Sequence, residues 1–219
     1  MPSGIVKRGL YALYDFTDPA GSQVLTDKSG RGYNGQNGSD AGADTNDVTF
    51  DGSKGVFGED DYISLTAKDT NLSRFKKYTI VCAYVTAKMD GYLWSNGNSA
   101  LDRNGMQVQS NILRFGYYNG TSYIGASGSV VQNIPYVATG ICDEGQIKLF
   151  INNILQTGTK AISSGATATQ DWGRQANVPE YFTGNIYMGL IYNTTLRPAE
   201  VRQNYKAIQN ILAVRGVSI

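Results

Sequence analysis

The chain has 219 residues, of which 41% are hydrophobic and 17% charged, a composition that excludes a disordered protein. The net charge is +1, and no basic stripe runs along the sequence, so we exclude nucleic acid as a partner. Histidine is absent, which excludes histidine triads, histidine-ligated zinc and histidine pH switches.

Strand signals begin near the N-terminus and recur about every ten residues. Apolar or alternating runs lie between Asn-Gly, Asp-Gly and similar dipeptides, which favour tight turns; Asn96-Gly97 and Asn104-Gly105 are two examples. This spacing is typical of an antiparallel sandwich or jelly roll. The expected strands are residues 10–16, 61–65, 78–85, 112–117, 122–125, 146–151 and 186–192. Residues 36–47 are expected to form a polar loop, and residues 156–180 a long excursion with at most one strand.

The hydrophobic period changes at the C-terminal end of the chain. Val201, Tyr205, Ile208 and Leu212 recur at helical spacing, which predicts one amphipathic helix over about 198–213. Arg197 stands where a capping Ser or Thr is preferred, so we expect a poorly capped helix start. One domain, residues 1–219, accounts for the whole pattern.

Two cysteines, Cys82 and Cys142, lie in predicted strands. Residues 1–8 have no apolar segment of the kind that a secretory signal requires, and no apolar run is long enough to span a membrane. We therefore expect two buried free thiols, with a disulfide as the alternative.

Several segments together resemble the concanavalin A-like lectin and glucanase superfamily, in particular its laminin-G-like jelly rolls. The segments that carry the resemblance are residues 9–16, 27–35, 48–52, 61–63, 78–80, 136–138, 146–153, 182–193 and 196–201. The resemblance implies an all-β, two-sheet antiparallel jelly-roll sandwich with one short C-terminal α-helix. Residues 205–216 also resemble the ends of such domains in structural proteins of tailed bacteriophages.

Catalysis is not expected from the carboxylates that the sequence places near one another. Glycoside hydrolases of the superfamily need two carboxylates that flank the scissile bond. The nearest candidate, Glu59 with Asp60 and Asp61, is followed by Ile63 and Ser64 where a second Glu would be required. We therefore predict that the protein is not an enzyme, and a glycoside hydrolase is the least favoured of the functions considered.

Calcium is the one cofactor that the sequence allows, through acidic residues in a Gly-containing loop; otherwise no cofactor is expected. The candidate metal ligands are Asp40, Asp44 and Asp47. Sugar or partner binding would use exposed aromatic side chains near turns. The candidate contact residues are Tyr92, Trp94, Tyr117, Tyr118, Tyr123, Trp172 and Tyr181, although core packing is the competing role for each.

Two functions follow from the resemblance. The first is a structural protein of a phage virion, in capsid decoration or in the tail, that forms a homo-oligomer, contacts other virion proteins and is made in the bacterial cytoplasm. The second is a carbohydrate-binding module that recognises glycans on a host surface. The sequence favours the virion protein slightly over the module.

Overall fold

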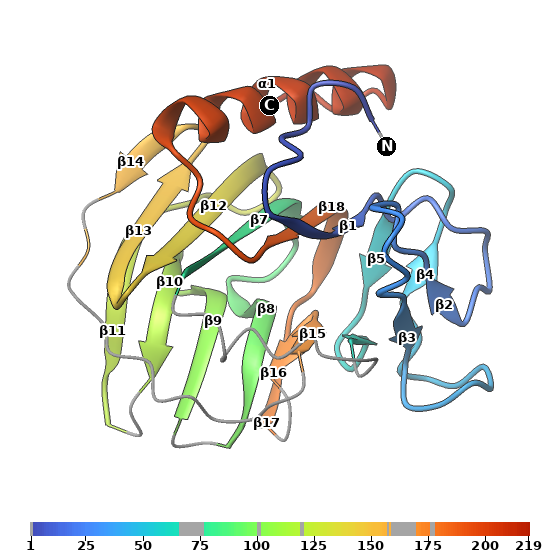
Figure 1. Cartoon of the computed structure of the whole chain (residues 1–219). Coiled ribbons are helices and arrows are strands. Elements are labelled where there is room, and N and C mark those ends of the chain that lie inside the picture. Colours follow the sequence, from blue (N-terminus) through green and yellow to red (C-terminus); the bar gives the residue numbers. More distant parts are fainter. Residues whose placement is uncertain are drawn as a thin grey trace.

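The fold is described here from a computed structural model and consists of two β-sheets and one helix (Figure 1). The structure describes residues 2–65, 77–99, 102–118, 121–156, 158, 170–175 and 178–219. Every expected strand is present at nearly its expected place, and residues 146–151 form a strand with those same bounds. The predicted fold class, an antiparallel two-sheet sandwich with a C-terminal helix, is confirmed.

The first sheet has β18 and β7 at its centre, in the order β14-β13-β12-β7-β18-β5-β4, with β1 also paired to β18. Every pairing in it is antiparallel. Its strands are β1 (Leu10–Tyr14), β4 (Thr49–Phe50), β5 (Gly55–Phe57), β7 (Lys77–Thr86), β12 (Pro135–Asp143), β13 (Gln146–Ile151), β14 (Ile154–Gln156) and β18 (Gly184–Tyr192).

The second sheet follows the order β11-β10-β9-β8-β15-β6-β3-β2, and β17 joins it beside β8. Its pairings are antiparallel except for the contact of Tyr181 with Tyr92, where β17 and β8 run parallel. Its strands are β2 (Val24–Leu25), β3 (Gly35–Asn37), β6 (Ile63–Ser64), β8 (Asp90–Ser99), β9 (Asp102–Gln109), β10 (Ile112–Tyr118), β11 (Tyr123–Ser129), β15 (Gln170–Trp172), β16 (Arg174–Gln175) and β17 (Val178–Tyr181).

The main hydrophobic core fills the space between the two sheets. In β13, Ile147, Leu149 and Ile151 face this core while Phe150 faces the other side, as the alternation in the sequence predicts. Trp94 and Trp172 lie directly opposite each other in the second sheet and are both fully buried in the core. Burial of such large rings makes a major contribution to the stability of a sandwich.

A second core lies between the first sheet and helix α1 (Pro198–Val214), which crosses the outer face of that sheet (Figure 1). Val201, Ile208 and Leu212 of the predicted stripe are buried there. The predicted helix is confirmed to within one residue. Because α1 covers the outer face of the first sheet, the second sheet is the one with an outer face that no helix covers. Within the described residues no helix is long and apolar enough to cross a membrane.

The start of α1 is stabilised in a way that the sequence analysis missed. Arg197 makes no capping hydrogen bond with its side chain, as expected, but its backbone N–H donates to the Glu200 carboxylate at 2.7 Å. The same carboxylate accepts two hydrogen bonds from Arg8, at 2.6 and 2.8 Å. Glu200 therefore links the helix start to the N-terminal segment, and these contacts lower its pKa to about 2.

The turns predicted at Asn96-Gly97 and Asn104-Gly105 are wrong, since these residues lie inside β8 and β9 and Asn96 pairs with Asn104. Gly105 serves packing instead of a turn. A Cβ atom on Gly105 would come within 2.5 Å of the Tyr92 ring, so the glycine makes room for this tyrosine. The long excursion at 156–180 also contains more strands than predicted, because β15, β16 and most of β17 lie within it.

Candidate functional site

The outer face of the second sheet carries a compact group of charged and aromatic residues around β15. Asp171 is fully buried, and its Oδ2 atom accepts a hydrogen bond from Nε of Arg174 at 2.8 Å. The Arg174 guanidinium in turn lies 3.2 Å from the centre of the Tyr62 ring, close enough for a cation–π contact. Arg174 is thus fixed from two directions, and its charge is balanced by Asp171.

Burial raises the pKa of Asp171, although Arg174 opposes this effect. The second carboxylate oxygen, Oδ1, has no hydrogen-bond partner among the described residues, and neither has Oγ of Ser95, which lies directly opposite Asp171 on β8. Ser64 lies opposite on the other side. The row Ser64–Asp171–Ser95 is therefore a polar strip set into the sheet.

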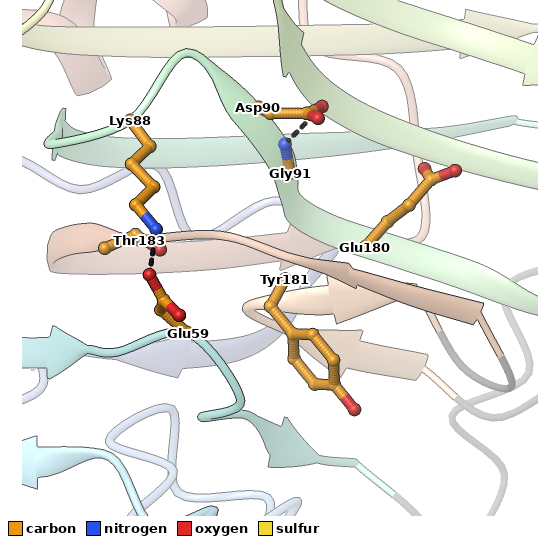
Figure 2. A pocket seen from close by; sticks show the side chains of 7 residues that line it. All are labelled: Glu59, Lys88, Asp90, Gly91, Glu180, Tyr181 and Thr183. Carbon is orange, nitrogen blue, oxygen red and sulfur yellow. Dashed lines mark hydrogen bonds and ion pairs between the residues drawn. The ribbon is translucent and has the colours of Figure 1, made fainter.

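A pocket of about 240 Å³ lies at the edge where β8 meets β17 (Figure 2). This volume is smaller than the ~300–1,000 Å³ of pockets that hold drug-sized ligands, so the pocket suits one unit of a longer molecule. The pocket is lined by Glu59, Lys88, Asp90, Gly91, Glu180, Tyr181 and Thr183. These residues come from the loop before β6, the turn between β7 and β8, the start of β8, and β17 with the residues that follow it.

The polar groups of the pocket are held in place by neighbouring groups. The ammonium of Lys88 pairs with the Glu59 carboxylate and thereby lowers the pKa of Glu59. A carboxylate oxygen of Asp90 accepts the Gly91 backbone N–H at 3.0 Å, and Glu180 accepts from Nε2 of Gln107 at 3.2 Å. Carboxylate oxygens, which only accept hydrogen bonds, are therefore the main polar groups of the pocket.

Glu180 connects the pocket with the outer face of the sheet, because Gln107 lies in the neighbouring strand β9. In Figure 2 the ring of Tyr181 points away from Glu180 and from the Lys88–Glu59 pair. Tyr181 lies directly opposite Arg174 in the β16–β17 pair, and directly opposite residues share one face of a sheet. Strand β17 thus has the pocket on one side and the Arg174 group on the other.

The aromatic contact residues predicted from the sequence divide into two groups. For Trp94, Trp172 and Tyr92 the prediction is wrong, since none of them is exposed by more than 1%. Tyr117 is partly buried against the core. The partly exposed residues that remain are Tyr118 and Tyr123, which are cross-strand neighbours at the β10–β11 end, and Tyr181 at the pocket. The structure therefore brings only Tyr181 of the predicted group to the pocket.

The acidic loop proposed as a metal site uses its carboxylates to hold its own backbone. Asp40 accepts from the Gly42 N–H at 2.6 Å, Asp44 from the Asn46 N–H at 2.8 Å, and Asp47 from the Asp44 N–H at 3.2 Å. Such contacts are usual for Asp in turns. Within the described part of the chain, no three His, Cys, Asp or Glu side chains form a group that could hold a metal ion. Calcium binding stays a prediction.

Four residues of the pocket, Lys88, Asp90, Glu180 and Thr183, are not predicted from the sequence, and Glu59 is considered there only for catalysis. No local pattern marks them, because Asp90 and Glu180 meet only through the parallel contact of β8 with β17. The cysteine prediction fares better. Cys82 and Cys142 are buried free thiols.

No protein-family model and no curated protein matches the sequence. Solved structures do share its fold. The sialidase of Trypanosoma rangeli, in complex with sialic acid, has a TM-score of 0.67 and 16% identity over 93% of this chain and 33% of its own. Domain 4 of AbnA, a GH43 extracellular arabinanase of Geobacillus stearothermophilus in complex with arabinotriose, has a TM-score of 0.68 and 17% identity over 90% of this chain and 98% of its own. A third structure, HCR/D-Sa-GBL1/C, has a TM-score of 0.63 and 14% identity over 93% of this chain and 53% of its own.

These similar structures are β-sandwiches, and at such low identity they show the fold alone. The chain spans about a third of the sialidase and nearly all of the arabinanase domain. The prediction that the protein is not an enzyme is contradicted, because this fold occurs in chains of a sialidase and an arabinanase, and we withdraw it. The virion role stays a prediction from the sequence, since none of these similar structures bears on it.

Proposed function

We propose that the protein binds an oligosaccharide, with one sugar unit in the pocket between β8 and β17. The observation that carries this proposal is the set of polar groups at the pocket: the carboxylates of Asp90 and Glu180, the Lys88 ammonium and the Thr183 hydroxyl. A sugar offers several hydroxyl groups on one ring, and carboxylate oxygens can accept hydrogen bonds from them.

The comparisons support the same class of ligand. The arabinanase domain that matches nearly over its whole length was solved with a bound arabinose trisaccharide, and the sialidase with a bound sugar acid. Neither protein is similar enough in sequence to transfer its ligand. The pocket is instead the reason to place a sugar at this point of the present chain.

The test is a panel of oligosaccharides measured by isothermal titration calorimetry, with Glu180→Gln as the variant. Hydrogen bonds to a charged group are worth about 1.5–3 kcal/mol, so we expect affinity to fall at least about tenfold. The matched control is Glu144→Gln, which removes a carboxylate from the exposed turn between β12 and β13. Thermal unfolding of each variant verifies that the fold is retained.

Absence of binding across the panel, or equal affinity of Glu180→Gln and wild type, would contradict the proposal. Hydrolysis of the same oligosaccharides is followed in parallel, because the fold also occurs in glycosidase chains. Release of shorter sugars from a bound oligosaccharide would add catalysis to the binding function.

A further inference from the structure

We infer that the outward side of α1, with the N-terminal segment beside it, binds the surface of a lipid bilayer that carries anionic headgroups. This interaction is separate from the proposed sugar binding and does not depend on it. The observation behind it is a patch of positive charge that the fold assembles from residues 1–8 and 197–206, which are far apart in the sequence.

The N-terminal segment lies along α1 and is held there by hydrogen bonds (Figure 1). The side chain of Gln203 donates to the carbonyl oxygen of Gly4 at 2.9 Å, and the side-chain oxygen of Asn204 accepts the N–H of Val6, also at 2.9 Å. Segment and helix therefore form one continuous face of the molecule.

This face carries a patch of exposed cations. The patch consists of Lys7, Arg8, Arg197, Arg202 and Lys206. The one carboxylate side chain in the two segments is that of Glu200, which Arg8 already binds at 2.6 Å. No ion pair joins the other four cations to a carboxylate within the described part of the chain. Four positive charges of the patch are thus available to an external anion.

The charges of the chain are divided between this face and the remainder. Residues 1–8 and 197–219 contain six of the 19 Lys and Arg residues and one of the 18 Asp and Glu residues, so their side chains carry +5 and the rest of the chain carries −4. Arg215, the sixth cation, is turned inward and donates to the carbonyl oxygens of Asp15 and Ser53. An anionic surface therefore attracts the protein with α1 toward it.

The charged side chains that flank the start of α1 do not change this balance. Lys77, which begins β7, is paired with Asp143 and Glu144 at the turn between β12 and β13. Lys148 in β13 is exposed and offsets the second of these carboxylates. The two cations and the two carboxylates cancel, so the positive patch ends at the start of the helix.

The shape of the patch favours a surface over a small ligand or a single polymer chain. The cations from Arg197 to Lys206 are spread over about 14 Å of a helix that crosses the outside of the sheet (Figure 1). The exposed positions of α1 carry no aromatic side chain on which a sugar ring or a base could stack. The lipids of a bilayer diffuse sideways, so anionic headgroups can gather under cations that are spaced in this way.

The contact is expected to be electrostatic and to stay at the headgroup level. The apolar stripe of α1 is buried against the first sheet and is not available for insertion into the bilayer. Val214, at the end of the helix, is 90% exposed and is the one large apolar side chain that α1 turns to the solvent. The pocket belongs to the second sheet, which α1 does not cover, so a surface-bound molecule keeps its pocket open to the solution.

The experiment is co-sedimentation of wild-type protein with two kinds of vesicle. One kind contains phosphatidylcholine alone, and the other contains phosphatidylcholine with one quarter phosphatidylglycerol, which is anionic. We expect binding to the anionic vesicles at low salt and little binding to the neutral ones. High salt should remove most of the binding, because it screens the attraction between exposed charges. This comparison uses wild-type protein and does not depend on the folding of a variant.

Two variants test whether the patch is the contact. Each Lys or Arg close to an anionic bilayer strengthens binding by about fivefold, so Lys206→Gln should weaken it about fivefold and Arg202→Gln/Lys206→Gln about 25-fold. Gln has nearly the helix propensity of Lys and Arg, so α1 should be retained, as circular dichroism can verify. The matched control is Arg114→Gln, which removes one cation from β10 in the second sheet and should change binding less than twofold.

Three results would overturn the inference. They are no binding to anionic vesicles, equal binding to both kinds of vesicle, and binding by Arg202→Gln/Lys206→Gln that equals that of wild type. Retention on heparin or on duplex DNA, or self-association at low salt, by a protein that does not bind the vesicles would overturn it as well and would identify a polymer or a second copy as the occupant of the patch. None of these results bears on sugar binding, which is tested by its own titrations.

Discussion

A buried hydrogen-bond network joins helix α1 to the rest of the fold, and it allows the cost of one substitution to be worked out. The side chain of Asn204 is fully buried in α1. Its Oδ1 atom accepts the backbone N–H of Val6 at 2.9 Å, and its Nδ2 atom donates to the Tyr192 hydroxyl at 2.9 Å. The Tyr192 hydroxyl in turn donates to the carbonyl oxygen of Val6 at 3.1 Å. The three residues form a closed ring between the N-terminal segment, β18 and the helix.

The variant Asn204→Ala removes two of these hydrogen bonds. It leaves the Val6 N–H buried without a partner, which costs about 1–3 kcal/mol, and it loses a second bond worth about 1 kcal/mol. The better helix propensity of Ala returns at most about 0.7 kcal/mol. We therefore expect the free energy of unfolding to fall by about 1–3 kcal/mol, a large part of the ~5–15 kcal/mol that stabilises a typical domain.

Urea unfolding followed by circular dichroism measures this loss. An unchanged m-value shows that the variant and wild type expose the same surface on unfolding, so their free energies of unfolding can be compared. The control is Asn210→Ala, which makes the same substitution at an exposed position of the same helix and should cost nothing. A double-mutant cycle with Tyr192→Phe should give a coupling energy of at least about 0.5 kcal/mol. A loss below about 0.5 kcal/mol in Asn204→Ala, or no coupling with Tyr192, would refute the reasoning.

Two other features of the fold give predictions of their own. The pKa of Glu200, about 2 in the folded protein, lies below its ordinary value of ~4.3, so its charge stabilises the fold above pH ~4.3 and this contribution is lost as the pH falls through about 2. Because the Arg8 side chain is 43% exposed, we expect Glu200→Gln to cost only about 1 kcal/mol at pH 7 and nothing near pH 2, as measured by urea unfolding at both pH values. If the difference in free energy of unfolding between wild type and Glu200→Gln is the same at both pH values, this role of the ion pair is disproved. Burial raises the thiol pKa of both Cys82 and Cys142. A thiol reagent should therefore label neither cysteine in the native protein and both in urea, and labelling of neither in urea would reveal a disulfide.

The sequence predicts the framework of this fold well, because each element has a local pattern. Alternation places Ile147 and Phe150 on opposite sides of β13, and helical spacing places Ile208 against the sheet, as the structure confirms. Such patterns depend only on residues within a few positions of one another. They identify elements and their buried faces without any knowledge of how the strands pair.

The sequence fails where the fold depends on irregularities or on distant contacts. Simple alternation assigns Tyr92 and Trp94, which are two residues apart in β8, to the same face of the sheet. A register shift between them places them on opposite faces instead. The pocket is formed by Asp90 and Glu180, which are distant in sequence and come together through strand pairing. Only the structure shows that these carboxylates share a site.

The location of the sugar on the protein tests the central claim most directly. Nuclear magnetic resonance of ¹⁵N-labelled protein, titrated with a neutral trisaccharide, reports which backbone amides sense the ligand. We expect the largest shifts at Lys88, Gly91 and Thr183 around the pocket, with α1 unaffected. Shifts that gather in the acidic loop at 40–47, or that leave the pocket amides unchanged while the sugar binds, would contradict the account.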